Sequence, residues 1–281
     1  MRAVIKLPTH TATRYVQPLR EGGSLPAIVD THDGGLFVAK FRGAGQGAKA
    51  LIAELIVGLL AREAGLPVPE LALIEVADTF GRSEPDPEIQ DLLRASYGTN
   101  IGLRYLDGAF NYDGTAAGDL VSTDLAARII WLDAFVTNPD RTHRNPNLLV
   151  WQRKPWLIDH GAALYAQHDW PSVSEERTRS AFPLIERHVL LRLSGEMGAA
   201  DQTMSTHITA QLIRDIITAI PESLIDDPAI TSEFASTTVA RERYVSYLTT
   251  RLESPRAFVH EAEEARVRVT RMVPQRMAAR R

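Results

Sequence analysis

Short apolar runs separated by glycine-rich turns dominate the first 41 residues of the chain. The apolar segments lie at 15–16, 27–29 and 36–39, and the turns between them lie at 20–24 and 30–35. Runs of this length, bounded by Gly, Asp and Ser, are typical of strands in a small sheet. The pattern therefore predicts three consecutive strands, of which the third ends at Lys40.

After the third strand, the apolar residues are spaced as in a helix. Apolar residues recur at helical intervals from 48 to 64, and the helix is expected to end at Gly65. Glu54 stands inside this apolar stretch, where an unpaired charge would be costly, and Lys40 is its natural partner. Further strands are predicted at 71–76 and 101–106.

The second half of the chain is predicted to be mostly helical. Ser122 or Thr123 is suited to cap a helix over 125–136, and apolar runs on either side of Arg153-Lys154-Pro155 predict a hairpin over 148–158. Later segments with helical spacing lie near 184–196, 206–220, 231–253 and 255–272. Strands followed by helices indicate an α+β protein.

The length, charge and composition of the chain exclude several classes of protein. At 281 residues, the chain is long enough for one large domain or for two lobes that share a cleft. Its formal net charge of −4 gives no field that would attract nucleic acid, and it has no cysteine for disulfides or thiolate metal sites. The first residues lack the apolar core of a signal peptide, and no apolar run is long enough to span a bilayer. We therefore expect a soluble cytoplasmic protein that binds neither membrane nor nucleic acid.

Polar residues gather on both sides of the predicted hairpin. Asp140 and Asn145 precede it, and Asp159 follows it within Ile158-Asp159-His160-Gly161. Asp140 is suited to accept a proton from a hydroxyl, and Asn145 and Asp159 offer the hard oxygen ligands that Mg²⁺ prefers. Asn, Asp and Pro also form ordinary turns, so a polar loop without a function is an alternative here.

The order of these residues indicates a particular chemistry. An Asp, an Asn five residues later, and an Asp-x-Gly beyond a hairpin follow one another as the catalytic residues of protein kinases do. Lys40 ends a strand after a glycine-rich turn, where kinases place the Lys that contacts the nucleotide phosphates. Taken together, these features predict phosphoryl transfer.

The sequence resembles the HipA-like kinases, in the small form that consists of the kinase domain alone. The resemblance implies a bilobal protein-kinase-like fold, with a small β-rich N-lobe over 1–106 and a mostly helical C-lobe over 107–281. It rests on segments in the family's order, namely Phe-Val-Ala-Lys (37–40), Leu-Ile-Ala-Glu-Leu (51–55) with Gly-Leu-Pro-Val-Pro-Glu (65–70), Gly-Leu-Arg-Tyr-Leu-Asp-Gly (102–108), Asn-Pro-Asp-Arg-x-x-x-Asn (138–145) and Ile-Asp-His-Gly (158–161).

The resemblance also implies roles for individual residues. Asp140 is expected to be the catalytic base, and Asn145 and Asp159 are expected to hold Mg²⁺. Lys40, oriented by Glu54, is expected to contact the phosphates of ATP. These residues form the expected catalytic centre.

Other implied roles concern the rim of the nucleotide site. Gly22, Gly23 and Ser24 are expected to close over the ATP phosphates, and Tyr105 and Leu106 lie in the segment whose backbone contacts adenine in kinases.

Two positions depart from the protein-kinase pattern. Thr142 stands where protein kinases carry a Lys, so Arg144 is the candidate for stabilising the transferred phosphoryl charge. His160 replaces the Phe of Asp-Phe-Gly, which leaves metal binding intact but puts in doubt a switch driven by that Phe.

The expected reaction is Mg²⁺-dependent transfer of the γ-phosphoryl group of ATP to a Ser or Thr hydroxyl of a protein. HipA-like kinases often belong to toxin–antitoxin modules, and some phosphorylate their own glycine-rich loop, where Ser24 is the matching hydroxyl. A toxin-like role, an antitoxin-like partner and self-phosphorylation are therefore expectations carried by the resemblance alone. A phosphatidylinositol 4-kinase-like lipid kinase, a nucleotide-binding pseudokinase acting as a regulator, and a Mg²⁺-dependent phosphohydrolase stay open as alternatives.

Overall fold

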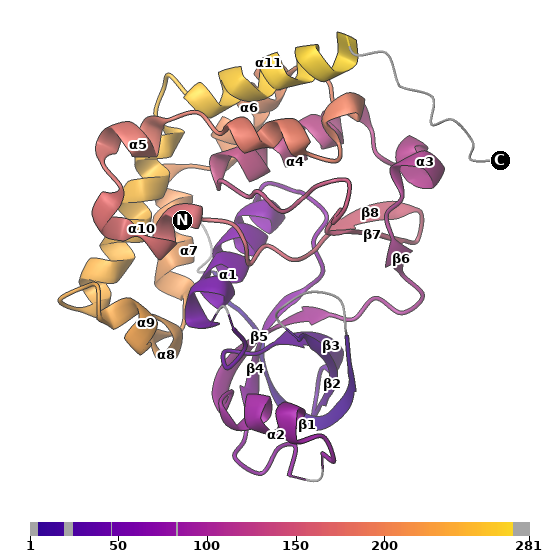
Figure 1. The fold of residues 1–281 in the computed structure, drawn as a ribbon, viewed down its shortest axis with the longest axis vertical. Coiled ribbons are helices and arrows are strands. Elements are labelled where there is room, and N and C mark those ends of the chain that lie inside the picture. Colours follow the sequence, from indigo (N-terminus) through magenta and orange to yellow (C-terminus); the bar gives the residue numbers. More distant parts are fainter. Residues whose placement is uncertain (1–4, 20–24, 46, 83, 272–281) are drawn as a thin grey trace.

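A β-barrel and a helical region form the two ends of the molecule (Figure 1). The computed structural model describes residues 5–19, 25–45, 47–82 and 84–271. The barrel strands are β1 (Thr9–Pro18), β2 (Ala27–Thr31), β3 (Gly35–Lys40), β4 (Leu71–Val76) and β5 (Gly98–Arg104), and a second sheet contains β6 (Phe110–Asn111), β7 (Leu148–Trp151) and β8 (Lys154–Leu157). The structure is α+β, as the sequence predicts.

Helices make up most of the remaining chain. They are α1 (Gly47–Glu63), α2 (Pro87–Arg94), α3 (Gly114–Ala117), α4 (Thr123–Phe135), α5 (Glu175–Arg179), α6 (Met197–His207), α7 (Ala210–Ala219), α8 (Glu222–Ile225), α9 (Pro228–Thr231), α10 (Thr237–Leu252) and α11 (Ala257–Arg271). Among the described residues, none of these helices combines the length and the apolar character that crossing a bilayer requires.

The barrel closes because its first strand pairs with its fourth. The strand order is β1-β2-β3-β5-β4, and the parallel pair β1–β4 aligns Thr9 with Leu73. Val29, Phe37 and Ile74 are buried in the small apolar cluster of the barrel. Local patterns predict the individual strands, but closure depends on a pairing between segments far apart in the sequence.

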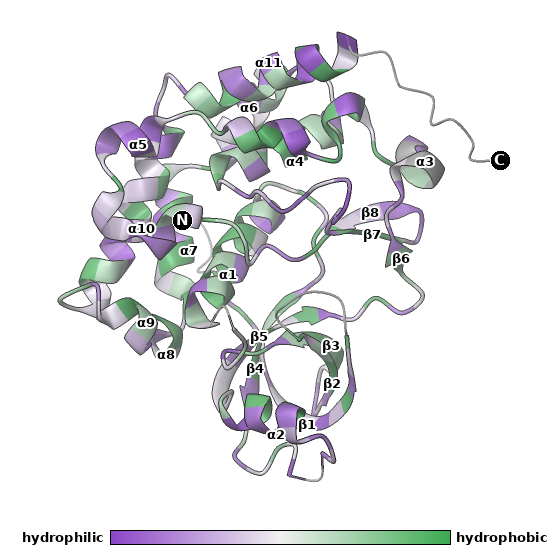
Figure 2. Cartoon of the chain, viewed as in Figure 1, coloured by the Kyte–Doolittle hydropathy of each residue, from purple (hydrophilic) through white to green (hydrophobic). Residues whose placement is uncertain are grey.

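Helix α1 is enclosed by other elements. Twelve of its 17 residues are buried, and it contacts β4 and β5 as well as α7, α8 and α9. Figure 2 shows that it is predominantly hydrophobic, whereas the surface helix α5 is largely hydrophilic. A helix that is apolar on all sides is stable in water only when it is enclosed in this way. Glu54 on α1 is therefore held at a fixed position.

Helix α4 directs the chain toward the predicted catalytic loop. Ser122 caps it as predicted, because its Oγ accepts the Leu125 backbone N–H at 3.2 Å. Nine residues of α4 are buried, and the chain leaves the helix at Val136, four residues before Asp140.

The predicted hairpin forms, but its turn differs from the prediction. Gln152 and Arg153 have φ values of 49° and 59°, and they connect β7 directly to β8. Two central residues with positive φ are the signature of a type I′ hairpin turn. Lys154 and Pro155 therefore lie within β8, and placing the break at Arg153-Lys154-Pro155 was wrong. Pro155 is tolerated because β8 is the edge strand of its sheet.

The helix predicted at 184–196 is also wrong. That region contains only two short 3₁₀ helices, Pro183–Arg187 and Leu191–Leu193. Its backbone is diverted, because Val189 N–H donates to the carbonyl of Arg141 at 3.1 Å. The segment predicted at 206–220 corresponds to α7, which begins after its cap Thr209, and the first two predicted residues are the end of α6.

Candidate active site

Lys40, at the end of β3, contacts two carboxylates. Its Nζ lies 2.7 Å from Glu54 Oε2 on α1 and 2.6 Å from Asp159 Oδ1, which follows β8. Lys40 and Glu54 are buried, whereas the Asp159 side chain is 39% exposed. The structure thus brings together three of the predicted residues from three elements, and Asp159 is accessible to a ligand.

The Lys40 ammonium lies between two carboxylates that favour its charged form. Burial disfavours the Lys40 ammonium, but the carboxylates of Glu54 and Asp159 outweigh burial and raise the pKa of Lys40. Burial also disfavours ionised Asp159, yet the Lys40 ammonium outweighs it and holds the pKa of Asp159 below its ordinary value. Glu54 Oε2 also accepts the His160 backbone N–H at 2.7 Å. Lys40 and Asp159 are therefore both charged at neutral pH.

Asp140 is held through one of its two carboxylate oxygens. Oδ2 accepts hydrogen bonds from Asn145 Nδ2 at 2.8 Å and from Asn147 Nδ2 at 3.0 Å. Asn147 has a φ of 47°, a left-handed conformation that Asn adopts more readily than most residues. The other oxygen, Oδ1, accepts no hydrogen bond from a described residue, so it is available to a substrate hydroxyl.

A buried carboxylate on α4 anchors the loop that carries Asp140. Asp133 Oδ1 accepts from Asn138 Nδ2 at 2.9 Å, and Asp133 Oδ2 accepts from Arg141 Nε at 2.6 Å. His188 lies 3.0 Å from the same Oδ2 through its Nε2. Because His188 Nδ1 accepts the Leu190 backbone N–H, the proton of the neutral ring is on Nε2, and His188 donates to Asp133.

Arg141 also connects the two ends of the hairpin. Its Nη1 donates to the carbonyl of Asn147 and, at 3.3 Å, to that of Ile158, and its Nη2 lies 3.2 Å from His160 Nδ1. Ile158 N–H donates to the same Asn147 carbonyl at 3.1 Å. The loop before β7 and the segment after β8 therefore meet at one end of the hairpin, where both predicted metal ligands lie.

A family model described as HipA-like kinase matches residues 13–245 of the chain. The chain belongs to the HipA-like kinase family. It is therefore a kinase, and the resemblance found in the sequence is confirmed. Its fold is similar to that of CtkA, a proinflammatory kinase of Helicobacter pylori, with a TM-score of 0.52 and 14% sequence identity over 87% of this chain and 95% of that chain. At this level of sequence identity, the similarity to CtkA concerns the fold alone. No protein of curated function matches the sequence.

The donor set of this HipA-like kinase fits Mg²⁺. Asn145 uses its amide nitrogen toward Asp140, which leaves its carbonyl oxygen for a cation, and Asp159 uses Oδ1 toward Lys40, which leaves Oδ2. Mg²⁺ typically takes one or two protein carboxylates and completes its shell with water and substrate phosphate. The described part of the chain holds no cluster of three or more His, Cys, Asp or Glu residues suited to a metal. A Mg²⁺ ion that binds together with a nucleotide needs only one or two protein ligands, and Asn145 and Asp159 offer two oxygen donors.

Other predicted residues lie outside these contacts. Arg144 is exposed and forms no side-chain hydrogen bond or ion pair with a described residue. Tyr105 N–H donates to the Leu36 carbonyl, and the Leu106 carbonyl accepts the Ala109 N–H, so these two backbone groups are already used within the kinase. The predicted phosphate-covering residues lie outside the described residues; they are Gly22, Gly23 and Ser24.

Sequence reasoning overlooked four residues of this site. Asn147 and Arg141 shape the catalytic loop, Asp133 pairs with Arg141, and His188 donates to Asp133. One signal was present, because Asp133 is an acid within an apolar helix, as Glu54 is. His188 carried no comparable signal, since its role depends on a contact with a helix 55 positions earlier in the chain.

Buried His188 makes the stability of this kinase sensitive to acid. Burial lowers the pKa of His188, although the Asp133 carboxylate acts in the opposite direction. In the unfolded chain the ring titrates near a pKa of about 6.5. As the pH falls through this value, the unfolded state binds a proton that the native state does not, so the free energy of unfolding decreases by up to about 1.4 kcal/mol per pH unit for this group.

Urea unfolding between about pH 6.5 and about pH 5 measures this effect. His188→Gln keeps a donor and an acceptor but cannot titrate, so its unfolding free energy is expected to fall less steeply than that of wild type. His260→Gln, at an exposed histidine of α11 that contacts Glu264 on the surface, serves as the matched control and should change the slope less than His188→Gln does. Identical slopes for wild type and His188→Gln would contradict the prediction.

Proposed function

We propose that this kinase transfers the γ-phosphoryl group of ATP, with Mg²⁺, to a Ser or Thr hydroxyl of a protein. One observation carries the proposal. Asp140, with one free carboxylate oxygen, and Asp159, paired with Lys40, approach the same end of hairpin β7–β8. A base for the acceptor, an oxygen ligand for a metal and a cation for phosphates thereby surround one small region, which is what phosphoryl transfer requires.

Each residue then has a separate task. Asn145 and Asn147 orient Asp140 so that Oδ1 accepts the proton of the attacking hydroxyl, and Lys40 binds the nucleotide phosphates. Asn145 and Asp159 would hold Mg²⁺, which would supply positive charge against the phosphates. We assign Arg144 to the transferred group, because its guanidinium is exposed and unengaged among the described residues.

The barrel and the helical region correspond, in this proposal, to the two lobes of a kinase-like fold. Residues 1–106 would bind the nucleotide, with Gly22, Gly23 and Ser24 over the phosphates and Tyr105 and Leu106 beside the base. Residues 107–281 would supply the catalytic loop and the metal ligands. The Lys40–Glu54 ion pair supports this assignment of roles to the two lobes. It directs Lys40 toward Asp159 and the catalytic loop.

Incubation of the full chain with γ-labelled ATP and Mg²⁺, followed by mass spectrometry of the intact protein, tests the proposal. We expect phosphate on wild type and none on Asp140→Ala, because the substitution removes the carboxylate proposed to accept the proton of the attacking hydroxyl. Phosphate mapped to Ser24 would support self-phosphorylation of the glycine-rich loop, in keeping with a toxin-like role and an antitoxin-like partner. ATP-dependent thermal stabilisation without transfer to any protein would instead favour a lipid kinase or a pseudokinase.

A further inference from the structure

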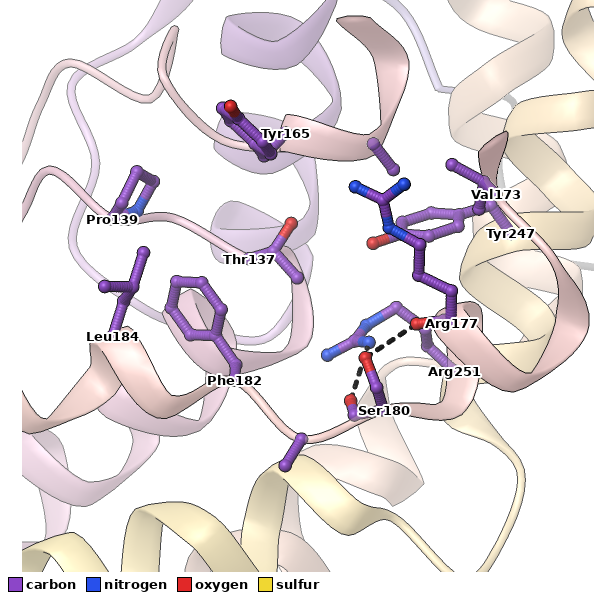
Figure 3. Close-up of a pocket in the computed structure, with 12 residues that line it drawn as sticks. Thr137, Pro139, Tyr165, Val173, Arg177, Ser180, Phe182, Leu184, Tyr247 and Arg251 are labelled. Carbon is purple, nitrogen blue, oxygen red and sulfur yellow. Dashed lines mark hydrogen bonds between the residues drawn. The ribbon is translucent and has the colours of Figure 1, made fainter. Parts of the chain in front are cut away.

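A cavity of about 320 Å³ lies beside Pro139, the residue that precedes Asp140 (Figure 3). Its walls come from the loop that follows α4, from the segment 165–184 and from α10. The residues that line it are Thr137, Pro139, Tyr165, Ala166, Val173, Arg177, Ser180, Ala181, Phe182, Leu184, Tyr247 and Arg251. Pro139, which lines the cavity, directly precedes the proposed base Asp140 in the chain.

The cavity is positively charged. Arg177 and Arg251 border it, and no acidic residue is among its described lining residues. Arg251 is buried, and its N–H groups donate to the carbonyls of Ala134, Phe135, Thr178 and Ser180. Arg177 donates to the carbonyl and hydroxyl of Ser172. Neither guanidinium forms an ion pair with a carboxylate of a described residue, although that of Arg251 also lies over the rings of Tyr247 and Phe258.

Thr137 adds a second, independent observation. Its φ is 52°, a left-handed conformation that is strained for a β-branched residue. Its Oγ1 is buried and has no hydrogen-bond partner among the described residues. Figure 3 shows the hydroxyl directed toward the space that Arg177 and Arg251 border. A buried hydroxyl without a partner, held there at a conformational cost, indicates a missing polar ligand.

The remaining wall is apolar. Val173 and Phe182 are buried, whereas Tyr165 is 63% exposed and Leu184 is 43% exposed. Large exposed apolar side chains around a concave site typically contact a partner. The cavity therefore combines a site for a negative charge with an apolar surface that extends beyond it.

We propose that this cavity is the docking site of the acceptor polypeptide. It receives an acidic side chain against Arg177, Arg251 and Thr137, while a neighbouring large apolar side chain packs on Tyr165 and Leu184. Docking there holds the acceptor hydroxyl near Asp140 and restricts the kinase to acceptors with this pair of residues. This inference rests on the proposed function, since it names the class of substrate for the same site.

A peptide library tests the docking site. Each peptide carries one central Ser or Thr, and the flanking positions are varied one at a time, with the full chain, labelled ATP and Mg²⁺ in the assay. Wild type is expected to prefer Asp or Glu at one flanking position and a large apolar residue at another. Arg177→Glu should lower kcat/KM for the best acidic peptide by roughly tenfold and change the preference at that position to Lys or Arg.

Arg187→Glu is the matched control, because it makes the same charge change at an exposed Arg of the same segment outside the cavity. It should keep the wild-type preference. The inference is overturned if Arg177→Glu retains the wild-type preference, or if both variants change it equally.

ATP turnover and self-phosphorylation, measured in parallel, separate the two proposals. A wild type that consumes ATP or phosphorylates itself, yet modifies no peptide or modifies all of them equally, overturns the docking site and leaves the proposed function standing. A wild type that transfers no phosphate and consumes no ATP overturns the proposed function and the docking site with it.

Discussion

Asp159→Asn is expected to reduce phosphoryl transfer by roughly a thousandfold or more, with the fold intact. The substitution removes the charge of a proposed Mg²⁺ ligand, and the loss of several kcal/mol of transition-state stabilisation corresponds to about tenfold in rate for each 1.36 kcal/mol. Asn is preferred to Ala here because Asp159 has a φ of 55°, which Asn tolerates. Lys40 keeps Glu54 as its partner, so no buried charge is left unpaired.

Initial rates with labelled ATP, together with thermal melts, measure this effect. Asp169→Ala is the matched control, because it removes an exposed carboxylate ten residues further along the chain. The control should keep wild-type activity. Asp159→Asn protein that melts like wild type and still turns over at a comparable rate would remove Asp159 from the proposed catalytic machinery.

The second large effect is expected on stability. Arg141→Met should lower the free energy of unfolding by about 3–5 kcal/mol, because it leaves the Asp133 carboxylate charged and buried without its cation. Burial by itself would raise the pKa of Asp133, and the Arg141 guanidinium outweighs that burial to hold this pKa low. Met fills much of the volume of Arg, so the loss reflects charge and hydrogen bonds more than an empty cavity.

Helix α4 offers a matched control for this substitution. Asp124 and Arg128 form an ion pair at 2.9 Å on the same helix, but Asp124 is exposed there. Arg128→Met should therefore cost only about 0.3–0.5 kcal/mol. Urea titrations of both variants provide the comparison. Equal losses for the two substitutions would show that the buried pair contributes no more than a surface pair.

Arg141→Met should also impair catalysis in the protein that remains folded. Arg141 donates to the carbonyls of Asn147 and Ile158, so its loss weakens the contact between the two ends of the hairpin, where the Ile158 N–H bond to Asn147 remains. Asn147, which donates to Asp140 Oδ2, is then held less firmly. Assays well below the unfolding temperature separate this positioning effect from the loss of folded protein.

Local sequence patterns were enough to predict many of the helices and strands of this protein. The helix over 48–64, the cap at Ser122 and the strand over 71–76 were recognisable because helical spacing, capping chemistry and apolar runs act between near neighbours in the chain. The pairing of Lys40 with Glu54 was also predictable. A charge inside an apolar helix requires a partner, and few candidates were available.

Other features depended on contacts between distant segments. The barrel closes through the pairing of β1 with β4, and the backbone near His188 leaves its expected helix to bond with Arg141. The cavity beside Asp140 likewise draws Thr137, Arg177 and Arg251 from three separate segments. Sequence by itself predicted Lys40, Glu54, Asp140 and Asp159 as candidates for the chemistry, together with several of the local elements that hold them. Only the tertiary structure decided which distant groups meet, because packing and burial, rather than spacing along the chain, set those contacts.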